Sequence, residues 1–224
     1  MALTRTQAKN FYDHFGIKQD SQAFYEDAAL DDLIAHGAFE QAGTVFEIGC
    51  GTGRFASRLL SKHLSPTASY FGIDISQTMT SIAKQRLSAY ADRATVVQSD
   101  GSMFFPVPDH SVDRVICTYV FDLLSDSDIH QAISEITRVL SPGGKLCLVS
   151  LTEGVTLPSR IVCALWSALF HLHAPLVGGC RPIQLGQFFN QHDWSIDYLN
   201  VVTQFGIPSE VRIASLPCTP DNGP

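Results

Sequence analysis

The stretch EIGCGTGR, residues 47–54, constrains the possible folds of this chain more than any other feature. It places Gly49, Gly51 and Gly53 between an apolar, strand-like run and a pattern with helical periodicity. Glycines between a strand and a helix let the backbone pass close to a ligand and present the helix N–H groups to it. The stretch therefore predicts an α/β unit whose first turn lines a binding site.

Five short apolar runs alternate with helical patterns along the middle of the chain. They cover residues 44–50, 69–76, 94–100, 112–120 and 145–151. Strands that are apolar throughout and separated by helices form parallel sheets covered on both faces. Two more β-type runs around the turn FGIPS predict a closing antiparallel hairpin. The predicted fold class is α/β, a doubly wound, mainly parallel seven-stranded sheet with ligands at the carboxyl ends of its strands.

The length of 224 residues suits one large domain better than two. We expect a single domain in four parts, without internal repeats. The parts are a helical N-terminal cap (1–40), a cofactor-binding core (43–151), a substrate-side insertion (152–193) and the closing hairpin (194–217).

Composition excludes several classes of protein. A net charge of −7 argues against nucleic acid as the main partner, because phosphate binding needs a basic face. It also disfavours electrostatic attachment to anionic lipid. The N-terminal residues show no secretory signal, and the apolar stretch IVCALWSALF is too short to cross a bilayer. The six cysteines have no CxxC spacing, so we expect buried reduced thiols, no metal site and a cytoplasmic protein.

The residues around the glycines indicate which kind of nucleotide-like ligand the turn can bind. A dinucleotide fingerprint needs Gly or Ala where this chain has Arg54, and a phosphate loop needs a Gly-Lys pair that is missing. Glu47 would repel a pyrophosphate but suits a cation. Asp74 ends the second strand, where a carboxylate can accept both ribose hydroxyls, and Asp100 ends the third, where it can meet an adenine amino group. This set fits S-adenosylmethionine, an adenosine that carries a sulfonium amino acid.

Four motifs in order and register resemble the class I S-adenosylmethionine-dependent methyltransferases, in particular the ubiquinone/menaquinone-type branch. They read VFEIGCGTGRF, GIDIS, SDGSMFFPVPDHSVDRVI and EITRVLSPGGKL, and the resemblance covers residues 43–151. It implies a Rossmann-like fold and the release of S-adenosylhomocysteine. It also implies cofactor contacts from Glu47, Gly49, Gly51, Gly53, Asp74, Ile75, Asp100, Gly101, Ser102 and Thr118.

The acceptor side is less defined. The branch often has a histidine after the fourth strand, where this chain reads YVFDLL with Asp122. We consider His171, His173, Asp122 and Tyr25 as candidate catalytic residues and Tyr12 and Arg181 as candidate substrate contacts. Each of them also has an ordinary structural interpretation, the two histidines as helix-end residues for example.

The apolar stretch 161–177 predicts a core helix, a lipophilic acceptor tunnel or a surface that rests on a membrane without stable insertion. We therefore expect a small, lipophilic or aromatic acceptor. The alternatives are a phospholipid or amine N-methyltransferase, a non-catalytic cofactor-binding partner subunit and, third, an NAD-dependent oxidoreductase, which Arg54 disfavours. The sequence leaves open the oligomeric state and whether C, N, O or S is methylated.

Overall fold

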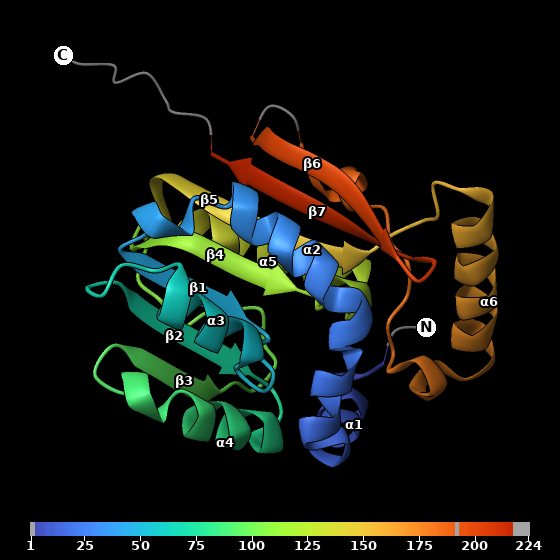
Figure 1. The fold of residues 1–224 in the computed structure, drawn as a ribbon, viewed down its shortest axis with the longest axis horizontal. Helices are drawn as coiled ribbons and strands as arrows, with labels where there is room; N and C mark the ends of the chain where they lie inside the picture. The colour runs from blue at the N-terminus through green and yellow to red at the C-terminus, as the bar shows by residue number, and fades with distance from the viewer. Residues whose placement is uncertain (1–2, 191–192, 217–224) are drawn as a thin grey trace.

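The computed structural model describes residues 3–190 and 193–216, which form one seven-stranded sheet with the order β3-β2-β1-β4-β5-β7-β6 (Figure 1). Strands β1 to β5 run parallel to one another, and β7 is antiparallel to both β5 and β6. The predicted fold class is confirmed. The strands are β1 (Thr44–Ile48), β2 (Ser69–Asp74), β3 (Ala94–Gln98), β4 (Val112–Thr118), β5 (Leu140–Leu151), β6 (Ser195–Gln204) and β7 (Ile207–Ser215).

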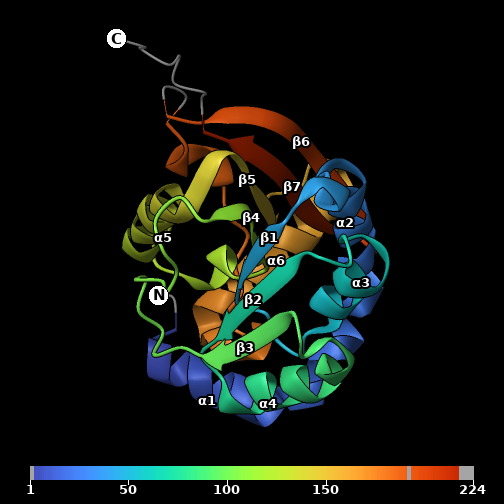
Figure 2. The ribbon, with the colours of Figure 1, turned by 90° about the vertical axis from the view of Figure 1, so that its left-hand side faces the viewer.

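Helices cover both faces of the sheet, with α2 and α3 on one side and α5 on the other (Figure 2). The α-helices are α1 (Arg5–Phe15), α2 (Ala23–His36), α3 (Arg54–Lys62), α4 (Gln77–Arg86), α5 (Asp126–Val139) and α6 (Leu157–His173). Short 3₁₀ helices are η1 (Gly16–Gln22), η2 (Phe39–Gln41), η3 (Ser88–Tyr90), η4 (Phe121–Leu123), η5 (Ala174–Val177) and η6 (Leu185–Phe188).

The helices bury the apolar sides that the periodicity of the sequence predicted. On α5, Ile129, Ile133 and Ile136 face the core, and α3 buries Phe55, Leu59 and Leu60. Ser76 caps α4 as expected, because its hydroxyl oxygen accepts a hydrogen bond from the Met79 N–H at 3.1 Å. All five cysteines that the structure describes are buried with free thiols, whereas Cys218 lies outside the described residues.

The boundary between α5 and β5 differs from the sequence-based expectation. SPGG at 141–144 predicts a break before a strand that starts at Lys145. In the structure β5 already begins at Leu140, which pairs with Val112, and the register then shifts so that Lys145 pairs with Arg114. Gly143, at φ +75°, lets the intervening residues bulge out without ending the strand.

The N-terminal helices differ in what they cover. Helix α2 packs against β5, β6 and β7 and therefore lies on a face of the sheet (Figure 1). Helix α1 and the short η1 pack against α4. Together α1 and η1 close the carboxyl edge of β1 and β2, where the glycine turn lies.

Candidate active site

A cavity of about 1340 Å³, counted with its open mouth, lies at the carboxyl edge of the parallel strands. Its walls come from the turn after β1, the ends of β2 and β4, the loop after β3 and the N-terminal segment. Open α/β sheets hold ligands in this position because the loops from successive strand ends converge there.

The three glycines of the turn after β1 have different reasons to be glycine. All three have positive φ, between +53° and +73°, a region that L side chains avoid. A Cβ on Gly49 would lie 2.4 Å from Val120 Cγ2, and one on Gly53 would lie 3.0 Å from Ala83 Cβ. A Cβ on Gly51 would meet nothing within 4 Å. Gly49 and Gly53 therefore permit packing, whereas Gly51 leaves open space in the cavity wall.

Asp74 is fixed by the backbone around it. Its Oδ2 accepts a hydrogen bond from the Gly51 N–H at 2.9 Å, and its Oδ1 accepts one from the Ser76 N–H at 2.8 Å. Burial raises the pKa of Asp74 to about 6, although both hydrogen bonds act in the opposite direction. The carboxylate therefore stands in one orientation in the cavity wall, next to the open face of Gly51, and is ionised at neutral pH.

Glu47 also lines the cavity, from the inside of β1. The Tyr70 hydroxyl donates a hydrogen bond to its Oε2 at 2.5 Å. Burial raises the pKa of Glu47 to about 8. This carboxyl group is therefore largely protonated at neutral pH, and a cation placed beside it would favour its ionised form.

The loop after β3 brings only part of its predicted set to the cavity. Ser99, Gly101 and Ser102 line the wall together with Ile75, but Asp100 does not. The Asp100 side chain is exposed, and its Oδ1 accepts a hydrogen bond from the Ser102 N–H at 2.8 Å. Its role with an adenine amino group stays a prediction. Thr118, at the end of β4, lines the cavity.

The acceptor-side candidates from the sequence do not gather in one place. Tyr12 lines the cavity, and its hydroxyl donates a 3.4 Å hydrogen bond to the Gly178 carbonyl. Tyr25 is buried beside it in the core but does not line the wall, and His171 and His173 are exposed on α6. Arg181 donates to the backbone carbonyls of Asp122 and Leu124 and pairs with Asp126, so its contacts are those of a residue that fixes the loop after β4.

Asp122 lies behind the cavity wall and is fully buried. Neither carboxyl oxygen has a hydrogen-bond partner among the described residues, and burial raises its pKa to about 7. Burial of an unpaired carboxylate is costly, so the folded protein favours the protonated form. Asp122 therefore cannot touch a ligand in this conformation, and its ionisation opposes folding.

We expect Asp122→Asn to make the protein less sensitive to alkaline pH. A carboxyl whose folded-state pKa is raised stabilises the fold below about pH 4 and loses that contribution as pH rises through 7. The amide cannot ionise, so the variant should exceed the wild type at pH 8 by on the order of 2 kcal/mol in unfolding free energy. Urea unfolding at pH 5 and pH 8 measures this. An equal difference at both pH values would refute the assignment.

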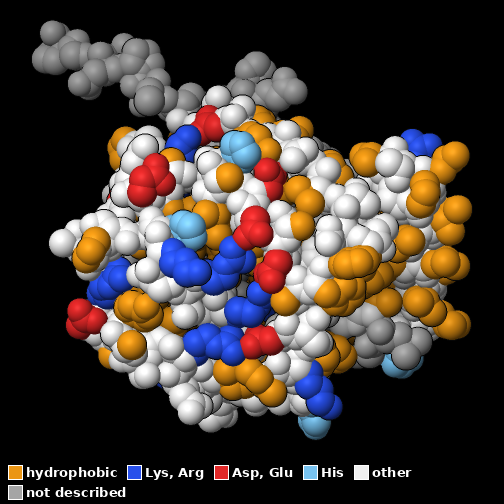
Figure 3. Space-filling view, viewed as in Figure 1, with side chains coloured by type: hydrophobic (Ala, Val, Ile, Leu, Met, Phe, Trp, Pro, Cys, Tyr) orange, Lys and Arg blue, Asp and Glu red, His pale blue; other side chains and the backbone are white. Residues whose placement is uncertain are grey.

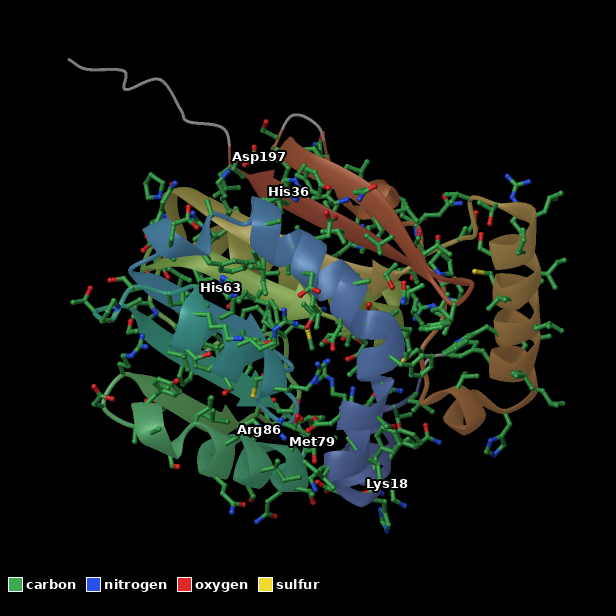
Figure 4. All side chains as sticks on the ribbon, in the orientation of Figure 1. Lys18, His36, His63, Met79, Arg86 and Asp197 are labelled. Carbon is green, nitrogen blue, oxygen red and sulfur yellow. The ribbon has the colours of Figure 1, made fainter. Side chains whose placement is uncertain are left out.

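Motif reasoning missed the residues that the N-terminal segment brings to the cavity. Gln19, Asp20 and Glu26 all line it, and the buried Gln19 Oε1 has no hydrogen-bond partner among the described residues. Asp20 accepts hydrogen bonds from Thr52 Oγ1 at 2.6 Å and from Arg86 at 2.5 Å. Arg86 lies on the side of α4 that faces the N-terminal helices (Figure 4). No sequence motif marks these residues, because their partners are set by tertiary packing.

Glu26 and Arg54 form an ion pair within the cavity wall. The Arg54 Nη2 lies 3.2 Å from Glu26 Oε2, and its Nη1 lies 2.5 Å from Asp27 Oδ1. Burial raises the pKa of Glu26 to about 7, although the nearby Arg54 lowers it. From the sequence, Arg54 could be used only to exclude a dinucleotide-binding fingerprint. The structure gives it a second function, which is to tie α2 to the start of α3.

The sheet order, the glycine turn and the cavity at the carboxyl edge define a Rossmann-like α/β protein with space for a nucleoside-sized ligand. Residues 45–144 match the family model described as a methyltransferase domain. This match, the methyltransferase relatives and the solved neighbours described below support a class I S-adenosylmethionine-dependent methyltransferase, as the motifs predicted. The narrower resemblance to the ubiquinone/menaquinone-type branch stays a prediction.

Relatives with curated sequences support the same family. An uncharacterized methyltransferase from Geobacillus kaustophilus is 30% identical over 53% of this chain and 52% of its own length. Another, from Bacillus mycoides, is 30% identical over 60% of this chain and 59% of its own length. The matched region thus spans between about half and three fifths of these relatives.

Solved structures share the fold at low sequence identity. The [4+2]-cyclase SpnF superimposes with a TM-score of 0.72 at 18% identity, covering 96% of this chain and 98% of its own. A geranyl diphosphate C-methyltransferase from Streptomyces coelicolor was solved with geranyl diphosphate and S-adenosyl-L-homocysteine. Its TM-score is 0.66 at 14% identity, and the match covers 85% of this chain and 79% of its own. In the part of the chain that the structure describes, no helix is both long and apolar enough to cross a membrane.

Proposed function

We propose that the protein transfers a methyl group from S-adenosylmethionine to a small, lipophilic acceptor and releases S-adenosylhomocysteine. The observation that carries this proposal is one cavity lined jointly by Glu47, Gly51 and Asp74 and by apolar side chains. The apolar lining includes Leu3, Leu30, Val120, Leu123 and Leu124.

The residues present fit this cofactor. Asp74 would accept the ribose hydroxyls, and the open face of Gly51 would let the ligand approach the backbone. The unpartnered Gln19 Oε1 would accept a hydrogen bond from the ammonium group, and Glu47 would lie near positive charge. When bound, the cofactor supplies a methyl group on a positively charged sulfur, which is already a strong donor. NAD is disfavoured instead by Arg54, which stands where a dinucleotide fingerprint needs Gly or Ala beside the pyrophosphate.

The cavity needs to exclude water and to hold the acceptor in line with the methyl group. Its leucines and Val120 supply that apolar enclosure. We assign to Glu26 the removal of a proton from an acceptor that carries one, because it lines the cavity and has a pKa of about 7. Asp122 and Tyr25 are buried away from the wall, and His171 and His173 lie outside it. A fold neighbour described as a geranyl diphosphate methyltransferase supports a lipophilic acceptor.

A second candidate function is a reaction other than methyl transfer in the same cavity. It is favoured by the neighbour described as a [4+2]-cyclase, which superimposes over nearly the whole chain. In that case the chain would bind the cofactor without consuming it.

Incubating the protein with methyl-labelled S-adenosylmethionine and a solvent extract of cells separates the two functions. We expect label in a small, organic-soluble product, and no label with Asp74→Ala. Binding of the cofactor without transfer of label to any fraction would reject the methyltransferase and favour the second candidate.

We also expect S-adenosylmethionine binding to release a proton from Glu47 at neutral pH. The folded-state pKa of Glu47 is raised to about 8, and a nearby cation favours its ionised form. Affinity should therefore rise as pH increases from about 6 to 8, by up to roughly tenfold per pH unit. Calorimetry in two buffers with different ionisation enthalpies measures the released proton. In Glu47→Gln the release should disappear, and its persistence would assign the proton elsewhere.

A further inference from the structure

Helix α6 carries an apolar face that nothing in the described structure covers. The helix lies at the edge of the molecule, and hydrophobic side chains line its outer side (Figure 3). Leu172 is 78% exposed and Leu157 is 76% exposed. The exposed face consists of Leu157, Ile161, Leu165, Leu169 and Leu172, spaced so that they share one side of the helix.

The opposite side of α6 is packed against the rest of the protein, and this packing holds the apolar face outward. Cys163 and Phe170 are buried, and the Trp166 indole N–H donates a 3.0 Å hydrogen bond to the Cys180 carbonyl. The preceding Gly178 carbonyl accepts from Tyr12, which lines the cavity. One short segment therefore joins the inner side of α6 to the cavity wall.

Two exposed aromatic rings lie next to each other at the β6–β7 turn, which contacts α6. Phe205 in the β6–β7 turn is 71% exposed, and its ring centroid lies 5.8 Å from that of Phe24. The neighbouring Gly206 packs against α6, since a Cβ there would lie 3.1 Å from Val162 Cγ2. Exposed apolar surfaces of this extent mark interaction sites in proteins that are otherwise well packed.

The charged residues around the apolar face of α6 indicate what binds to it. The chain has no Asp or Glu between Glu153 and Asp193, although its net charge is −7. Arg160, His171 and His173 are exposed on α6. If a second copy packed α6 against α6, these side chains would find no carboxylate on the facing helix. A bilayer offers an apolar layer next to a layer of anionic headgroups, which matches an apolar face bordered by basic side chains.

We propose that the outer face of α6 docks on a lipid bilayer surface that contains anionic headgroups. The helix lies in the interface with its leucines among the upper acyl chains and Arg160 at the phosphates. With 17 residues and a packed inner side, α6 does not span the bilayer. This inference goes beyond the proposed function and does not depend on it, because docking needs neither cofactor nor acceptor.

Co-sedimentation of the full chain with vesicles of equal parts phosphatidylcholine and phosphatidylglycerol tests the proposal. We expect the wild type to pellet with the vesicles, and Leu165→Glu to lower its partition coefficient about tenfold or more. Leu199→Glu is the matched control, because Leu199 is an exposed leucine on β6, and it should bind as the wild type does. Arg160→Glu should weaken binding to these vesicles and lower the melting temperature only slightly, since the exposed Arg160 side chain makes one hydrogen bond, from its Nε to the Gly154 carbonyl at 3.2 Å.

Three outcomes would overturn the proposal. One is wild-type protein that stays in the supernatant, and another is a Leu165→Glu variant that binds as tightly as the wild type while melting at the same temperature. The third is a dimer in solution that Leu165→Glu converts to a monomer, which would assign the face to a second copy.

Discussion

Replacing Asp74 by Ala should lower the affinity for S-adenosylhomocysteine by about a hundredfold or more. The carboxylate stands in a fixed orientation in the cavity wall, held by the Gly51 and Ser76 N–H groups. Two hydrogen bonds from ribose hydroxyls to a charged acceptor contribute about 1.5–3 kcal/mol each. Their loss, together with the loosened Gly51 turn, gives the expected effect. Calorimetric titration measures it.

Asp113 supplies a matched control for this variant. Its Oδ2 also accepts two backbone hydrogen bonds, from the Gly43 N–H at 2.8 Å and the Thr44 N–H at 3.0 Å. These residues lie at the amino ends of β1 and β4, away from the cavity. Asp113→Ala should lower stability and leave the affinity for S-adenosylhomocysteine unchanged. If both variants lose affinity to the same extent, the effect of Asp74→Ala comes from general destabilisation and the ribose assignment is wrong.

Substituting alanine for Gly49 and for Gly51 should separate folding from binding. At Gly49 the new methyl group would lie 2.4 Å from Val120 Cγ2 at a φ of +69°, so we expect a loss of about 2–4 kcal/mol in stability. At Gly51 it meets open space, so the cost is limited to about 1–2 kcal/mol of backbone strain. The same methyl group would occupy the space through which the ligand approaches. We therefore expect affinity to fall at least tenfold in Gly51→Ala.

Thermal unfolding and calorimetric titration, both applied to the two variants, test this separation. The contrasting result would be a Gly51→Ala variant that binds S-adenosylhomocysteine with wild-type affinity. The ligand would then not pass along the open face of the glycine turn.

The sequence predicted the sheet and the first half of the cavity because both depend on local patterns. A buried strand, a glycine turn and an acid at the next strand end are close in the chain, so their spacing carries the geometry. Gly51 and Asp74 illustrate this, since both were predicted to line one site and a hydrogen bond joins them in the structure. The Asp100 side chain shows the limit. The motif places Asp100 next to Gly101 and Ser102, which line the cavity, but its exposed side chain accepts a local hydrogen bond from the Ser102 N–H and is not part of the lining.

The rest of the candidate site depends on contacts between distant parts of the chain. Gln19 and Glu26 come to the cavity because Asp20 and Asp27 pair with Arg86 and Arg54, and no spacing rule predicts such partners. Helix α6 is a similar case. A helix that is apolar nearly all round is expected in the core, and only the packing of Trp166 and Phe170 shows that its leucines face outward.

If the cavity is a site for a sulfonium nucleoside, the full chain should bind labelled S-adenosylmethionine, and equilibrium dialysis tests this most directly. We expect saturable binding at one site per chain, with competition by S-adenosylhomocysteine and none by NAD. Absence of saturable binding, or displacement of the label by NAD, would show that the cavity is not such a site.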